Sequence, residues 1–75
     1  MSDVNPDALA FLERFAAAAG VPTPSADEVE VLLNLAGAAA HGSHRQAAPV
    51  ACWLAARAGL TAEAGLALAR SLADG

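Results

Sequence analysis

Basic residues are scarce in this sequence. It contains four arginines, no lysine, and eight aspartates and glutamates, which leaves a formal net charge of −4 at pH 7. Affinity for nucleic acid depends mostly on cationic contacts with phosphates, and these arginines are scattered along the chain rather than clustered. We therefore expect no binding of DNA or RNA.

Cysteine and long apolar runs are also lacking. Cys52 is the only cysteine, so no disulfide can form within the chain, which fits a reducing compartment. The longest alanine run, Ala16–Ala19, is far too short to cross a bilayer, and no basic-then-apolar signal segment is present. We expect a cytoplasmic protein without a membrane partner.

Alanine and leucine are the most frequent residues in the sequence. The apolar fraction is 56%, and 22 of the 75 residues are alanine and ten are leucine. This is enough for one hydrophobic core, so we expect a single helical domain over residues 1–75. A chain this short buries only about 60–65% of the surface that its unfolded form exposes, so a partner that covers more surface would help.

Hydrophobic spacing and punctuation predict four helices. They cover roughly residues 6–19, 26–40, 49–58 and 62–73. Asn5 before a proline, Ser25 in a capping box, and Thr61 are expected to cap helix starts, and Pro49 is expected to be the first residue of the third helix. No alternating run of β-branched residues predicts a strand. The sequence thus predicts an all-α fold, either a compact four-helix bundle or an orthogonal four-helix cluster.

Two apolar patterns bear on partners. The second predicted helix has the broadest apolar stripe, which favours either enclosure in the core or a surface for a protein partner or a homodimer. In the third helix, Arg57 follows Trp53 by one turn, a spacing that allows the two side chains to stack. We interpret Trp53 as a core residue.

The stretch His41–Pro49 is the candidate functional site, since it holds both histidines and one of the four arginines. A helix that starts at Pro49 would leave its next two amides free to bind an anion beside Arg45. The candidate binding residues are His41, His44, Arg45, Val50 and Ala51. The simpler interpretation, which we prefer, is that Arg45 only anchors the loop by bonding the carbonyls that end the preceding helix.

Metal and catalytic chemistry find little support in the sequence. His41, His44 and Cys52 are its only nitrogen or sulfur ligands for zinc, one short of a structural site. Cys52 lies among alanines, where cysteine acts as a small hydrophobe, and neither Ser43 nor Ser71 lies in a nucleophile motif. We expect no metal, no cofactor, no catalytic residue and no enzymatic activity.

The run from Ala40 to Pro49 resembles a small actinobacterial domain of unknown function. That domain is found alone or behind molybdenum-cofactor guanylyltransferase domains. The resemblance rests on the Ala40-His41-Gly42 step, on Arg45, and on Ala47-Ala48-Pro49 before a short apolar helix, and it covers about Leu9 to Leu72. Gln46 stands where proline is expected and His44 where a small residue is usual. The resemblance implies an accessory role near molybdenum-cofactor maturation.

Two functions follow as hypotheses. The first is a non-enzymatic accessory or protein-interaction module, linked through the resemblance to a molybdenum-cofactor guanylyltransferase. The alternative is a small anion- or nucleotide-binding domain centred on His41–Pro49. This chain has no nucleotidyltransferase domain of its own, so it cannot transfer a guanylyl group alone.

Overall fold

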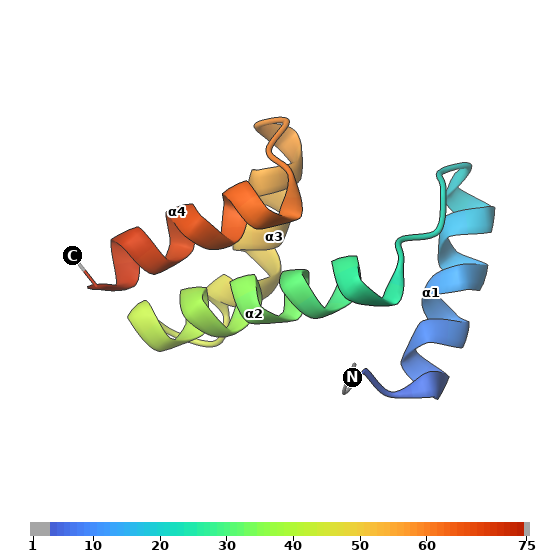
Figure 1. Cartoon of the computed structure of the whole chain (residues 1–75), viewed down its shortest axis with the longest axis horizontal. Coiled ribbons are helices and arrows are strands. Elements are labelled where there is room, and N and C mark those ends of the chain that lie inside the picture. The colour runs from blue at the N-terminus through green and yellow to red at the C-terminus, as the bar shows by residue number, and fades with distance from the viewer. Residues whose placement is uncertain (1–3, 75) are drawn as a thin grey trace. The chain divides into compact units, whose positions relative to one another are not determined.

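The computed structural model describes residues 4–74 as helices joined by short loops (Figure 1). The helices are α1 (Pro6–Ala19), α2 (Ala26–Gly42), α3 (Ala47–Arg57) and α4 (Ala62–Asp74). Residues 4–74 contain no strand, which confirms the predicted all-α class. None of these helices combines the length and the apolar character that a bilayer span requires.

The chain divides into two compact units within α2. The first ends at Glu30 and contains α1, and the second begins at Val31 and contains most of α2 together with α3 and α4.

In the first unit, local signals fix both ends of α1. The Asn5 side chain accepts a hydrogen bond from the Asp7 amide at 2.7 Å, ahead of proline at the first helical position. Gly20 ends the helix with φ at 76°, a left-handed conformation that favours glycine. Ala16 is buried, whereas Phe11 and Phe15 are 54% and 62% exposed.

Hydroxyl side chains cap two further helices as the sequence predicts. Ser25 Oγ accepts a hydrogen bond from the Glu28 amide at 3.0 Å before α2. Thr61 Oγ1 does the same for the Ala64 amide at 3.1 Å before α4. Each hydroxyl satisfies one of the first-turn amides that have no acceptor within the helix.

The predicted start of α3 at Pro49 is wrong by two residues. The helix begins at Ala47 because the preceding turn winds directly into it: the Ala47 amide donates to the His44 carbonyl at 2.8 Å, and the Ala48 amide donates to the Arg45 carbonyl at 3.1 Å. Pro49 is tolerated as the third helical residue, since first-turn amides have no intrahelical acceptor to lose.

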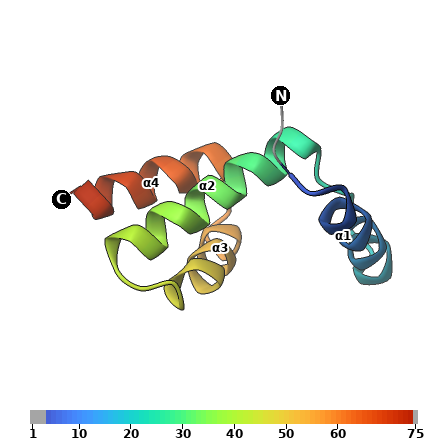
Figure 2. The ribbon, with the colours of Figure 1, turned by 90° about the horizontal axis from the view of Figure 1, so that it is seen from below.

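In the second unit, α2 and α4 run side by side in the same direction (Figures 1 and 2). Leu35 of α2 is 1% exposed and is the most deeply buried large side chain. Gly65 of α4 lies against it: a Cβ atom built at Gly65 would stand 2.6 Å from Leu35 Cδ1 and 3.2 Å from the Ala55 Cβ of α3. The absence of a side chain at Gly65 therefore lets α4 approach both of its neighbours.

Gly42 serves close packing rather than an unusual backbone turn. Helix α2 includes Gly42 and so runs two residues beyond its expected end at Ala40. A Cβ atom at Gly42 would stand 2.8 Å from the Cβ and 2.9 Å from the Cα of Ala73, so the ends of α2 and α4 touch here. Gly42 is not among the glycines with positive φ, which are Gly20 and Gly59. A side chain at Gly42 would push against the backbone of α4.

Trp53 lies on the surface, so its interpretation as a core residue is wrong. Its side chain is 57% exposed, and the guanidinium carbon of Arg57 lies 4.7 Å from its ring centroid. The expected stacking is therefore present. The small residues of α3 face its neighbours instead, because alanine lets helix axes approach closely.

Candidate functional site

The loop between α2 and α3 is hydrogen-bonded to the last turn of α2. Ser43 Oγ donates to the Ala39 carbonyl at 2.7 Å, and the Ser43 amide donates to the Ala40 carbonyl at 3.3 Å. These are the carbonyls at the end of α2, so Ser43 has the anchoring role that we assigned to Arg45. The hydroxyl and the backbone amide of Ser43 therefore hold the loop to the end of α2.

The amides that begin α3 are already engaged. The Gln46 amide donates to His44 Nδ1 at 3.2 Å, the next two amides bond to carbonyls of the turn, and Pro49 has no N–H group. Val50 and Ala51 come fourth and fifth in the helix, past the positions whose amides lack an intrahelical acceptor. The free amides that the anion hypothesis places at these two residues depend on a helix start at Pro49, which the structure does not have.

The charged candidates of the loop do not gather into one pocket. His41 is exposed on the last turn of α2, and His44 and Arg45 are exposed in the loop. Within residues 4–74, no three histidine, cysteine, aspartate or glutamate side chains lie close enough together to hold a metal ion. Over the same range, the Arg45 guanidinium makes no hydrogen bond or ion pair.

Cys52 lies at the contact between α3 and α2. Its thiol is partly buried and points to the Leu32 carbonyl, with a sulfur–oxygen distance of 3.8 Å. Burial raises the pKa of the Cys52 thiol above its ordinary value. A raised pKa leaves less thiolate at neutral pH, so the cysteine is a poorer nucleophile and a poorer metal ligand than an exposed one.

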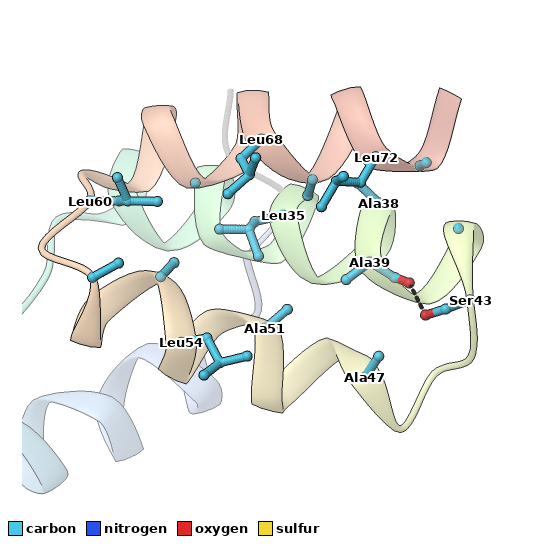
Figure 3. A pocket seen from close by; sticks show the side chains of 16 residues that line it. Leu35, Ala38, Ala39, Ser43, Ala47, Ala51, Leu54, Leu60, Leu68 and Leu72 are labelled. Atoms are coloured by element: carbon cyan, nitrogen blue, oxygen red, sulfur yellow. Dashed lines mark hydrogen bonds between the residues drawn. The ribbon is translucent and has the colours of Figure 1, made fainter. Parts of the chain in front are cut away.

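The second unit carries an open apolar groove (Figure 3). Its volume is about 590 Å³. Helices α2, α3 and α4 all contribute to it, and Figure 3 shows Leu35, Leu54 and Leu68 around a common space. The lining consists of leucine, alanine and glycine with a single serine: Leu35, Ala38, Ala39, Gly42, Ser43, Ala47, Ala51, Leu54, Ala55, Ala58, Leu60, Gly65, Leu68, Ala69, Leu72 and Ala73.

This groove is an apolar surface that meets solvent. Leu54 and Leu68 are 54% and 51% exposed, and Leu72 is 73% exposed. The hydroxyl of Ser43, the one polar side chain of the lining, is already bonded to the Ala39 carbonyl. The groove can therefore bind by covering apolar area, and it offers a ligand no free side-chain hydrogen-bond donor.

Sequence reasoning missed the groove because three separate segments form it. Of the predicted site residues, only Ala51 lines it. The signal that was available is the three leucines of α4, Leu66, Leu68 and Leu72, together with Leu54 of α3. Leu54, Leu68 and Leu72 lie on apolar arcs that neighbours as small as alanine do not cover.

Comparison with known proteins yields a family without an assigned activity. No curated protein and no solved structure matches the chain. One family does match, over residues 4–75, which is nearly the whole length. The chain belongs to the family described as "Domain of unknown function (DUF6457)".

Proposed function

We propose that this chain is a non-enzymatic protein-interaction module that binds an apolar helix of a protein partner in the groove of α2, α3 and α4. The observation that carries the proposal is the open groove of about 590 Å³, lined by leucine and alanine. Contiguous exposed apolar patches on small domains mark interaction surfaces, because exposing them to water is unfavourable.

The shape of the groove favours a helix as its occupant. Three helices wall it, and α4 with its 13 residues is about 20 Å long. An amphipathic helix that inserts side chains spaced by one turn would cover Leu54, Leu68 and Leu72 together. An extended peptide that binds by strand addition would instead need an open sheet edge, and residues 4–74 contain no sheet.

The chemistry of the lining supports a module without catalysis of its own. The groove presents methyl groups, and its one hydroxyl, that of Ser43, already donates its hydrogen to the Ala39 carbonyl. The partly buried Cys52 thiol, with its raised pKa, is a weak nucleophile. The lone cysteine fits a reducing compartment, so the cytoplasm is the location that we propose.

The partner that the resemblance suggests is a molybdenum-cofactor guanylyltransferase. We propose an accessory role beside such an enzyme in an actinobacterium, supported by the run Ala40-His41-Gly42, Arg45 and Ala47-Ala48-Pro49. Isothermal titration of the chain with the purified guanylyltransferase tests this link. A measurable affinity that Leu72→Glu weakens is expected, and no heat of binding at millimolar concentrations would contradict the link.

The groove itself is tested with a designed helical peptide. The peptide carries leucines at i, i+4 and i+7 with glutamates elsewhere, and its control has the same composition with leucines that share no face. Methyl signals of Leu54, Leu68 and Leu72 should shift on titration with the first peptide only. Leu72→Glu should raise the peptide concentration needed to shift the Leu54 and Leu68 signals and Leu33→Glu should not, because Leu33 is exposed outside the groove. Equal responses to both peptides would refute a helix-binding groove.

A further inference from the structure

Charge is divided unevenly between the two units. Residues 1–30 carry six acidic side chains against Arg14, a formal net charge of −5. Residues 31–75 carry Arg45, Arg57 and Arg70 against two acids, a formal net charge of +1. A surface on the second unit is therefore complementary in charge to the first unit of another molecule.

Two arginines of the second unit lie next to groove-lining residues in the sequence. Arg45 lies between the lining residues Ser43 and Ala47, and Arg70 directly follows the lining residue Ala69. Both arginines are exposed. Asp74, which directly follows the lining residue Ala73, is exposed as well, so two arginines stand against one acid beside the groove. An occupant with an apolar face and acidic flanks fits this surface better than a basic one, because rim charges of opposite sign attract and those of like sign repel.

Helix α1 has the features that such an occupant needs. Phe11 and Phe15 are both more than half exposed, one turn apart, with ring centroids separated by 6.2 Å. Asp7 and Glu13 supply two acidic side chains on the same helix against one arginine, so α1 carries a formal net charge of −1. That arginine is Arg14, whose guanidinium carbon lies 5.8 Å from the Phe11 ring centroid. With 14 residues, α1 is about 21 Å long, close to the length of α4 that walls the groove.

We propose that this chain forms a symmetric dimer in which α1 of each copy docks in the groove of α2, α3 and α4 of the other. The proposal rests on the proposed function and names the occupant of the same groove as a second copy. Phe11 and Phe15 are the anchors, and they cover Leu68 and Leu72 of the partner copy. Each copy offers one helix and one groove, and a reciprocal exchange between two copies satisfies both of them.

The dimer surface differs from the stripe on α2 that the sequence suggests. Leu35 of that stripe is 1% exposed and thus already used inside the second unit. Leu33 is the large apolar side chain of α2 that remains more than half exposed. A single leucine is a small contact beside the two phenylalanines and the leucines of the groove, so α2 contributes through the groove wall instead.

Sedimentation velocity of the full chain across a concentration series tests the proposal. We expect a species of twice the chain mass of 7.4 kDa. Phe15→Glu and Leu72→Glu should each yield monomers, whereas Leu33→Glu, an equally polar change outside the groove, should leave the dimer intact. Since all three side chains are more than half exposed, the variants should keep their helices in circular dichroism. Phe11→Glu repeats the test through the second anchor.

Mixing the two monomeric variants gives the sharpest result. The Leu72→Glu copy keeps an intact α1 and the Phe15→Glu copy keeps an intact groove, so a mixture should form one-to-one heterodimers through a single docked helix. A monomer at every concentration, or a dimer that Phe15→Glu does not weaken, would overturn the proposal. A monomer that still binds the designed helical peptide would leave the groove's function standing and remove the second copy as its occupant.

Discussion

Replacing Gly65 with alanine tests the close contact on which the second unit is built. The added Cβ atom would stand 2.6 Å from Leu35 Cδ1 and 3.2 Å from the Ala55 Cβ. Leu35 Cδ1 is the end of a flexible side chain that also lines the groove, so it can turn only toward the groove, whereas the Ala55 Cβ moves only with its helix. Either Leu35 leaves its rotamer or α4 shifts outward, and overpacking of this kind costs about 1–3 kcal/mol.

Gly37 supplies the matched control. It lies inside α2 in the same unit, and a Cβ atom built there meets nothing within 4 Å. Alanine is favoured over glycine in a helix by about 1 kcal/mol, so Gly37→Ala should be stabilising. The same gain applies to Gly65→Ala and offsets part of its cost. The free energy of unfolding should therefore differ by about 1–3 kcal/mol between the two variants.

Thermal unfolding followed by circular dichroism measures this difference. For a domain of this size, 1 kcal/mol shifts Tm by about 4–8 °C, so Gly65→Ala should melt at least several degrees below Gly37→Ala. Equal melting temperatures would mean that α4 does not approach α2 at Gly65, and the packing described for the second unit would then be wrong.

Three further outcomes follow. Leu35→Ala should lower the free energy of unfolding, measured by urea titration, by about 2–5 kcal/mol. Leu33 is 56% exposed, so Leu33→Ala should change this free energy by no more than about 0.5 kcal/mol. Equal losses would contradict the assigned burial. The Cys52 thiol should react with a disulfide reagent more slowly in the folded chain than in urea. Because folding raises the pKa of the thiol, the free energy of unfolding should fall as the pH rises above about 9.0 and through the pKa of the folded state. The Cys52→Ala variant should not show this decrease. Inorganic phosphate should leave the Val50 amide signal unchanged, and a saturable shift that Arg45→Ala removes would restore the anion site.

Local signals in the sequence predicted the helices well. Ser25 and Thr61 cap the helices that follow them, and Gly20 ends the first, because each acts through atoms only a few residues away. The start of α3 was misplaced for a related reason. Proline at the first helical position is the common pattern. The turn that begins the helix two residues earlier is formed by backbone hydrogen bonds, and no residue type in the sequence indicates it.

The candidate site was harder to predict than the fold. His44 and Arg45 attracted attention because polar residues are rare in this chain, yet His44 bonds to the turn and Arg45 is simply exposed. The groove depends on how Leu54, Leu68 and Leu72 meet across helices that are distant in sequence. Helical periodicity gives the apolar face of each helix, but it does not say how much of that face a neighbour covers.

The most direct test of the central claim is the affinity of the designed acidic helical peptide for Leu72→Glu compared with Leu33→Glu, measured by isothermal titration. Burying a leucine side chain contributes about 1.5–3 kcal/mol, so Leu72→Glu should weaken binding by about tenfold or more, while Leu33→Glu should bind like the unchanged chain. If both variants bind the peptide equally well, the groove of α2, α3 and α4 is not the binding surface of this protein.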